Sequence, residues 1–178
     1  MINCFKRIEL TNWEELSKKV DNYIQTTDIL QKKYSWNTID SKEILDKIPM
    51  LKTMFLEFDL KVKTIAVIFR SPLSSGGVHV DSGIGVRALI PIKNCRGSYT
   101  KFFDVDKSKI QLTTGAAGDM YHHIPESAII SEIASVETIT PIMFDPQVPH
   151  GVWTNPNLYS PRLTLTIGFN RSPRELLS

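Results

Sequence analysis

The stretch RLTLTIGF, Arg162–Phe169, alternates polar and apolar residues from its first position to its last. Two leucines, an isoleucine and a phenylalanine alternate with an arginine, two threonines and a glycine. Successive side chains of a β-strand point to opposite faces of a sheet, so this stretch predicts a strand with one apolar and one polar face. We expect the apolar face to pack against helices or against a second sheet.

The chain beyond about residue 51 has the same β-rich character. Short runs of β-branched and aromatic residues lie between prolines and glycines, and they predict strands at 64–69, 78–80, 87–92, 99–105, 138–144 and 162–169. Evenly spaced short strands favour a sandwich or barrel over a parallel sheet with crossover helices. The fold is therefore expected to be mainly β.

The first fifty residues have helical patterns instead. TNWE at 11–14 fits a capping box, and apolar residues then recur at steps of three and four as far as Val20. A second short helix is predicted at 41–48, where a proline ends it, while 31–40 is too polar to assign. Because the helices precede the strands, we expect them to cover one outer face of the β unit.

Length and composition favour one soluble globular domain. The 178 residues are long enough to bury a core, and 42% hydrophobic and 22% charged residues are ordinary proportions. We predict a single domain, 1–178, with helical support at 1–50, a β core at 51–170 and a tail at 171–178.

Charge and cysteine content bound the partners and the compartment. A net charge of +2 is too small to favour a nucleic-acid or membrane surface, and no apolar run has the length of a signal peptide or a membrane span. Cys4 and Cys95 are too few for a disulfide framework and too far apart for a zinc motif. A reduced, cytoplasmic protein is expected.

GGVHVDSG at 76–83 places an imidazole and a carboxylate two residues apart. On an extended strand, His79 and Asp81 project to the same side about 6–7 Å apart, and both can reach one metal ion. Val80 then points into the packing. A His-x-Asp pair also occurs by chance and often makes only a surface hydrogen bond, so a third ligand is needed.

His150 is the best candidate for that third ligand. It follows two prolines in DPQVPHGV, 145–152, and a glycine comes directly after it. Two imidazoles and one carboxylate leave several coordination positions open, which suits non-heme Fe(II), although zinc or manganese can use the same ligands. His122 and His123 lie in the predicted loop 113–127, either as ordinary loop residues or facing a substrate.

Arg162 opens the alternating strand, and Thr164 lies on the same face. A buried arginine is costly unless it meets an anion, and a guanidinium suits a carboxylate that accepts two hydrogen bonds. The polar face is therefore expected to line a pocket for a dicarboxylate. The turn-like stretch 153–161 suggests that His150 and Arg162 lie on adjoining, hairpin-like strands.

Three motifs in order resemble the HxD…H…RxS/T pattern of the Fe(II)/2-oxoglutarate-dependent oxygenases. They are HVD at 79–81, PHG at 149–151 and RLT at 162–164. The runs at 87–105 and 141–155 also resemble double-stranded β-helix proteins related to aspartyl/asparaginyl and prolyl hydroxylases, small phage-encoded members included. The resemblance covers about residues 60–170.

The resemblance implies a double-stranded β-helix of the jelly-roll or cupin type, on which the N-terminal helices expected above would cover one outer face. It implies Fe(II) on His79, Asp81 and His150. It implies that Arg162 and Thr164 bind the distal carboxylate of 2-oxoglutarate. Arg87 is a candidate for contact with the 1-carboxylate, or alternatively for a salt bridge at the rim of the barrel.

The implied activity is oxidative decarboxylation of 2-oxoglutarate by dioxygen, coupled to hydroxylation of a C–H bond. Peptide side chains, free amino acids, nucleobases and small metabolites are all compatible substrates, and long nucleic acid is disfavoured. Two alternatives stay open. One is a cupin-like metalloenzyme that does not use 2-oxoglutarate, and the other is a non-catalytic β-helix module that keeps the metal.

Overall fold

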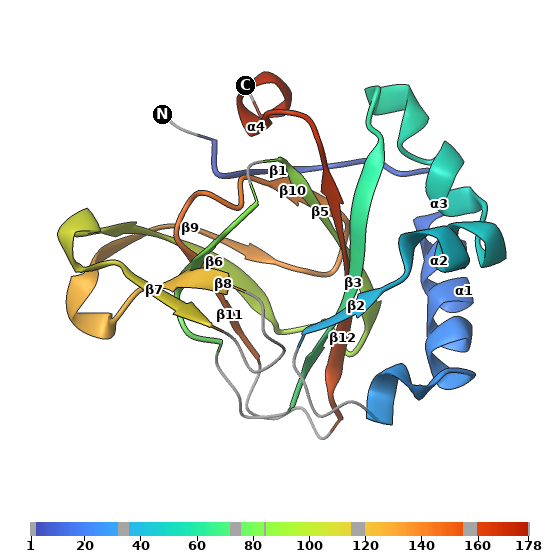
Figure 1. Ribbon diagram of the computed structural model, residues 1–178, viewed down its shortest axis with the longest axis horizontal. Coiled ribbons are helices and arrows are strands. Elements are labelled where there is room, and N and C mark those ends of the chain that lie inside the picture. The colour runs from blue at the N-terminus through green and yellow to red at the C-terminus, as the bar shows by residue number, and fades with distance from the viewer. Residues whose placement is uncertain are drawn as a thin grey trace.

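The computed structural model describes residues 3–31, 36–71, 76–83, 85–114, 120–154 and 160–177. In these residues the chain forms two antiparallel six-stranded sheets, with helices beside one of them (Figure 1). The major sheet has the order β1 (Phe5–Arg7), β10 (Ile142–Phe144), β5 (Arg87–Lys93), β12 (Arg162–Phe169), β3 (Val62–Arg70), β2 (Trp36–Ile39). The minor sheet has the order β7 (Gln111–Thr114), β8 (Met120–His123), β4 (His79–Asp81), β11 (His150–Trp153), β6 (Tyr99–Val105), β9 (Ile129–Glu137).

The helices of the described residues are short apart from the first. They are α1 (Trp13–Gln25), α2 (Ser41–Lys47), α3 (Met50–Thr53) and α4 (Pro173–Leu176), with 3₁₀ turns η1 (Asp28–Gln31), η2 (Leu56–Phe58), η3 (Lys107–Lys109) and η4 (Glu126–Ala128). A mainly β architecture with N-terminal helices is therefore confirmed.

The winding of the chain brings distant segments together. From β3 to β6 successive strands alternate between the two sheets, and they alternate again from β9 to β12. The result is two four-stranded blocks, β10-β5-β12-β3 and β4-β11-β6-β9, whose edges are extended by β1, β2, β7 and β8. Strands from both ends of the β region therefore lie side by side.

β12 is at the centre of the major sheet and is buried along its whole length. The predicted alternation is confirmed: its apolar residues Leu163, Leu165, Ile167 and Phe169 belong to the largest core cluster, together with residues of α1 and α2. These two helices cover the outer face of the major sheet (Figure 1). The polar side of β12 consequently faces the space between the sheets.

The two sheets are joined by a second, smaller cluster between their inner faces. Leu89, Ile142 and Phe144 of the major sheet pack against Phe102 and Val136 of the minor sheet. This apolar contact closes one end of the space between the sheets, and the other end contains the polar residues described below.

The N-terminal fifty residues are more than a helical support, because they also supply β1 and β2 to the major sheet. The unassigned stretch 31–40 contains β2, whose Asn37 and Ile39 are buried against β3. The capping-box prediction was wrong. α1 is preceded by Asn12 in the left-handed conformation, with no side-chain cap, and left-handed backbone is tolerated better by asparagine than by most residues.

Three further features of the structure differ from what the sequence predicts. The stretch 113–127 is not a plain loop, because it contains β8, although its residues 115–119 lie outside the described part of the chain. β11 and β12 do not form a hairpin: β11 pairs with β4 and β6 in one sheet and β12 with β3 and β5 in the other. The tail contains α4, and Leu177 after it is buried in the main core.

The packing of β12 makes a stability prediction. Replacing the fully buried Leu165 by alanine removes apolar contacts and leaves a cavity, so we expect a loss of about 3 kcal/mol in the free energy of unfolding. The matched control is Leu56→Ala, since that leucine is 64% exposed and should change stability by about 0.5 kcal/mol or less. Urea denaturation measures both, and equal losses would contradict this assignment of the core.

Candidate metal centre

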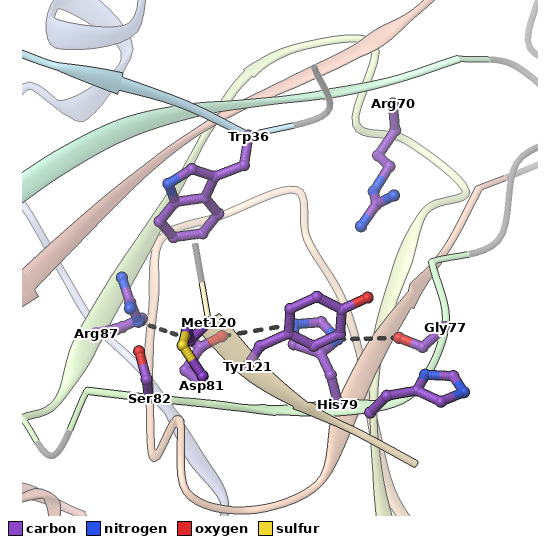
Figure 2. Close-up of a pocket in the computed structure, with 10 residues that line it drawn as sticks. Trp36, Arg70, Gly77, His79, Asp81, Ser82, Arg87, Met120 and Tyr121 are labelled. Carbon is purple, nitrogen blue, oxygen red and sulfur yellow. Dashed lines mark hydrogen bonds and ion pairs between the residues drawn. The ribbon is translucent and has the colours of Figure 1, made fainter. Parts of the chain in front are cut away.

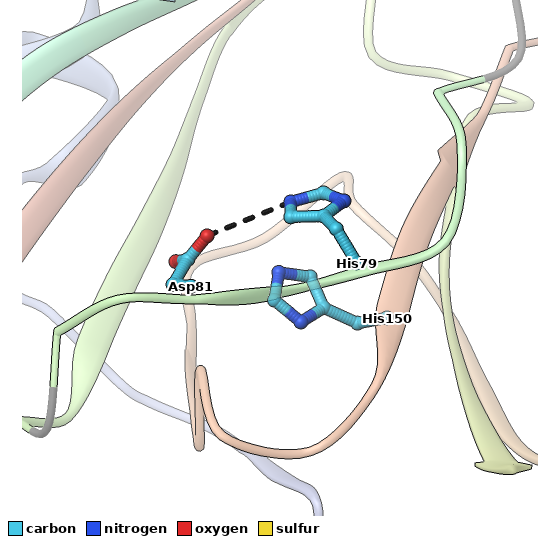
Figure 3. Close-up of side chains that lie close together, drawn as sticks. All are labelled: His79, Asp81 and His150. Atoms are coloured by element: carbon cyan, nitrogen blue, oxygen red, sulfur yellow. Dashed lines mark ion pairs between the residues drawn. The ribbon is translucent and has the colours of Figure 1, made fainter. Parts of the chain in front are cut away.

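His79 and Asp81 come from β4, a three-residue strand in the middle of the minor sheet. Both side chains point into the space between the sheets (Figure 3), as their spacing predicts. Val80 between them is buried in the apolar cluster on the other face. Nε2 of His79 lies 3.5 Å from Oδ1 of Asp81.

His150 is the first residue of β11, and it lies directly opposite His79 in the antiparallel pairing of β11 with β4. The two ring centroids are 4.6 Å apart. One nitrogen from each histidine and one carboxylate oxygen of Asp81 all lie within 4.8 Å of one another. The three side chains predicted as ligands are therefore brought together in a group that can hold one metal ion.

Backbone carbonyls fix the protonation pattern of both rings. Nδ1 of His79 lies 2.9 Å from the carbonyl oxygen of Gly77, and Nδ1 of His150 lies 2.8 Å from that of Val148. A carbonyl only accepts, so each Nδ1 carries the proton and donates it. Nε2 of each ring then has its lone pair free, which is the state a metal ligand requires.

The surroundings of His150 are apolar. Its ring lies 5.0 Å from that of Phe144 and 6.2 Å from that of Phe102, measured between centroids. Burial, with a smaller contribution from the charge of His79, lowers the pKa of His150 to about 4. The imidazole is therefore neutral near pH 7 without any metal.

Asp81 is oriented by Arg87, the first residue of β5. Nε of Arg87 lies 2.6 Å from Oδ2 of Asp81, an ion pair whose angle is not that of a hydrogen bond. The guanidinium also lies over the ring of Trp36, 5.0 Å from its centroid. Oδ2 thus faces a cation and Oδ1 faces His79, and the rim salt bridge is the arrangement seen for Arg87.

A cavity of about 250 Å³ opens beside these residues (Figure 2). Its lining includes His79, Asp81 and Arg87, and the other lining residues are Trp36, Arg70, Gly77, Ser82, Met120, Tyr121 and His123. His123 and Tyr121 lie opposite His79 and Asp81 in the pairing of β8 with β4, so both face the cavity. His122 lies opposite Val80 instead, on the other face of the sheet.

Arg162 and Thr164 lie on the inner face of β12 and are fully buried. Among the residues that the structure describes, no nitrogen or oxygen atom makes a hydrogen bond to the three guanidinium nitrogens of Arg162 or to the hydroxyl of Thr164, and the thiol of Cys95 is the neighbour that interacts with Arg162. Burial lowers the pKa of Arg162 to about 10, so it remains charged. The expectation that Arg162 and Thr164 line a pocket is wrong for this cavity, because neither is among its lining residues. Arg70, which pairs with Arg162 from β3, lines it instead.

One glycine of the 76–83 stretch has a visible role. A Cβ on Gly76 would come 2.7 Å from Nη2 of Arg70. Gly76 therefore makes room for a guanidinium.

Arg70 and Trp36 were not predicted from the sequence as residues of this site, and Trp36 lies in the stretch 31–40 that was too polar to assign. Tyr121 lies in the predicted loop 113–127, where substrate-facing residues were expected. Arg70 follows the predicted strand 64–69 directly, and its importance comes from the pairing with Arg162, which no local pattern encodes. The signal that the sequence offered was that the predicted strand 64–69 could extend by one residue to include Arg70.

Comparison with solved structures identifies the fold as the double-stranded β-helix. HygX from Streptomyces hygroscopicus with nickel and 2-oxoglutarate bound is 12% identical, with a TM-score of 0.59 over 96% of this chain and 84% of that one. The epimerase SnoN in complex with Fe³⁺, α-ketoglutarate and nogalamycin RO is 9% identical, with a TM-score of 0.58 over 96% and 80%. A prolyl-4-hydroxylase from Pseudomonas putida is 17% identical, with a TM-score of 0.50 over 95% and 88%.

The predicted double-stranded β-helix, and the predicted resemblance to these oxygenases in fold, are confirmed. No family model matches the sequence, and no curated protein matches it. None of the helices in the described part of the chain combines the length and the apolar character needed to cross a membrane. Neither Cys4 nor Cys95 forms a disulfide bond.

The ligand geometry predicts which histidines bind metal. His79→Ala and His150→Ala should each weaken Fe(II) binding roughly 100-fold or more, because each removes one of three donors. The control is His122→Ala, which comes from the neighbouring strand but from its opposite face. Anaerobic calorimetry measures the affinities. Stoichiometric, tight iron in the His79 or His150 variant would remove that residue from the ligand set.

The buried His150 also predicts a pH effect on the metal-free protein. Its pKa is about 4 when folded against an ordinary 6.5, so between these values the unfolded chain binds more protons than the folded one. Stability should therefore fall as the pH decreases from about 6.5 to about 4, by on the order of 3 kcal/mol from this residue. Denaturation of the chelator-treated protein at several pH values tests this. His150→Gln should flatten the dependence, and identical pH profiles for the two proteins would contradict it.

Proposed function

We propose that this protein is an Fe(II)- and 2-oxoglutarate-dependent dioxygenase that hydroxylates a substrate still to be identified. One observation carries the proposal. A group of two imidazoles and one carboxylate shares the space between the sheets with a buried arginine that has no carboxylate partner among the described residues. The first feature fits a metal with open coordination positions, and the second fits the far end of a dianion.

The three donors fit iron by their chemical identity and by the protonation and closeness of their donor atoms. His79 and His150 each present an unprotonated Nε2, and Asp81 presents an oxygen next to them. Two histidines and one carboxylate with positions left open are the ligands of non-heme Fe(II) oxygenases. The same donors accept manganese or zinc. We propose iron because the accompanying arginine fits 2-oxoglutarate, and not because of the ligands alone.

The surroundings of Arg162 fit a carboxylate. An unpaired guanidinium that is removed from water costs several kcal/mol, and this one is accompanied by the unpartnered hydroxyl of Thr164 two residues along the same face. One carboxylate can accept from the guanidinium and from the hydroxyl together. A cupin-like enzyme without 2-oxoglutarate has no use for this pair, and neither has a module that only binds metal.

When both are bound, iron and 2-oxoglutarate supply the oxidising chemistry, in which dioxygen converts the 2-oxo acid into succinate and carbon dioxide and a C–H bond is oxidised. The chain itself orients and shields. Gly77 and Val148 hold the two imidazoles by their Nδ1 protons, and Arg87 holds one oxygen of Asp81. Phe102 and Phe144 keep water from the inner side of His150.

The substrate is expected at the open side of the cavity. Trp36, Met120 and Tyr121 line the cavity together with the ligands (Figure 2), and His123 is a further lining residue. A peptide side chain, an amino acid, a nucleobase or a small metabolite remain the proposed classes. A cytoplasmic location is kept as part of the proposal.

The test is turnover and cosubstrate binding by the purified protein. Loaded with Fe(II), it should bind 2-oxoglutarate and form succinate slowly without a substrate. Arg162→Met should weaken 2-oxoglutarate binding about 10- to 100-fold, because it removes charge-assisted hydrogen bonds, while iron binding is kept. Arg96→Met is the control, since Arg96 is exposed and distant in sequence from the motifs.

Three outcomes distinguish the proposed function from its alternatives. Iron bound without any 2-oxoglutarate binding or succinate would contradict the proposal and favour a metal-binding module. Unchanged 2-oxoglutarate affinity in Arg162→Met would favour an enzyme that does not use this cosubstrate in the proposed way. Loss of both iron and 2-oxoglutarate in Arg162→Met would mean that the arginine supports the structure of the site.

A further inference from the structure

Arg70 and Arg162 lie directly opposite each other on the neighbouring strands β3 and β12. Directly opposed residues have Cβ atoms about 4.5–5.5 Å apart and project from the same face of the sheet. Here that face is the inner one, because the alternate residues Leu163 and Phe69 pack in the core against the helices. Two guanidinium groups are therefore held side by side between the sheets.

No carboxylate of the described residues pairs with either arginine; Tyr121 is the group that acts on the charge of Arg70, and Cys95 is the one that acts on the charge of Arg162. Among the described residues, no hydrogen bond reaches Nε of Arg70 or any of the three nitrogens of Arg162, and each of these atoms is buried. The neighbouring thiol of Cys95 donates to the carbonyls of Lys93 and Leu163 and carries no charge to compensate. Like charges in direct opposition destabilise a sheet. A buried anion is the partner that this arrangement lacks.

The two arginines differ in depth. Arg162 is fully buried and absent from the cavity wall, whereas Arg70 lines the cavity that contains His79 and Asp81. The Arg70 side chain extends into this cavity (Figure 2), and its Nη2 lies over Gly76, where a Cβ would be only 2.7 Å away. Arg70 thus extends the cationic surface of Arg162 toward the metal ligands.

We propose that Arg70 and Arg162 together form a two-arginine clamp for one carboxylate, the distal carboxylate of 2-oxoglutarate. The inference rests on the proposed function and adds Arg70 to the residues that bind the cosubstrate. Each oxygen of a carboxylate accepts from a different guanidinium, and the negative charge removes the repulsion between the two cations. Arg70 also covers the carboxylate on the cavity side, where it would otherwise face water.

The alternative use of Arg70 is to bind an anionic group of the primary substrate. Its Nε is buried, without a partner and on the same inner face as Arg162, and the guanidinium that lines the cavity lies beside Arg162, which is itself closed off from the cavity. The observations therefore favour the cosubstrate.

The experiment compares a diacid with a monoacid. Protein loaded with Fe(II) is titrated anaerobically by calorimetry with 2-oxoglutarate and with 2-oxopentanoate, which has the same carbon chain but no distal carboxylate. Arg70→Met should weaken 2-oxoglutarate binding about 10- to 100-fold and leave 2-oxopentanoate within about two-fold. Arg70→Lys, which keeps the charge but loses the planar fork, should fall between. Arg96→Met is the matched control.

The outcomes are distinguishable from those of the proposed function. If the wild-type protein prefers 2-oxoglutarate and Arg70→Met keeps the same preference, the clamp is wrong and the proposed function stands. If Arg70→Met weakens both acids equally, Arg70 acts on the metal end or on the fold, and the clamp is again wrong. If the wild-type protein binds neither acid, both inferences fail. The melting temperature of metal-free Arg70→Met should equal or exceed that of the wild type, since an unpaired buried charge is removed, and a marked decrease would contradict the clamp.

Discussion

The register between β4 and β11 is the constraint on which the candidate site depends. It sets His79 directly opposite His150, and the period-two geometry of β4 then puts Asp81 on the same side. A shift of one residue in β4 would turn both ligands outward and Val80 inward. The register is held from both faces, because Val78 and Val80 are buried on one side and the imidazole of His79 is bound to a carbonyl on the other. The packing that stabilises the strand therefore also assembles the donors.

The space between the sheets has two parts that differ in how their charges are balanced. At the metal end, the carboxylate of Asp81 is balanced by Arg87, which Trp36 covers, and each imidazole donates its Nδ1 proton to a backbone carbonyl. At the far end, two arginines lie without a counter-charge from the described chain. The described part of the chain thus holds two adjacent cations between the sheets without a carboxylate to neutralise them. A ligand that carries a negative group at one end and chelating oxygens at the other resolves both conditions at once.

Much of this site could be predicted from the sequence because its key residues lie in strongly patterned strands. The alternation in Arg162–Phe169 gave the orientation of Arg162 and Thr164, and the spacing of His79 and Asp81 gave their common side. What could not be predicted depends on pairing between distant segments. Arg70 matters because β3 lies beside β12, and Trp36 because β2 lies beside β3. β9 was missed because it is an edge strand with exposed isoleucines, so it lacks the burial pattern that marks an interior strand.

The most direct measurement of the central claim is an anaerobic crystal structure with Fe(II) and 2-oxoglutarate bound. The account predicts iron held by Nε2 of His79, Nε2 of His150 and one oxygen of Asp81 at about 2.0–2.2 Å, with the distal carboxylate against Arg162. Iron bound by other side chains would contradict it. So would a ligand whose far carboxylate lies in solvent while the guanidinium of Arg162 stays unpartnered.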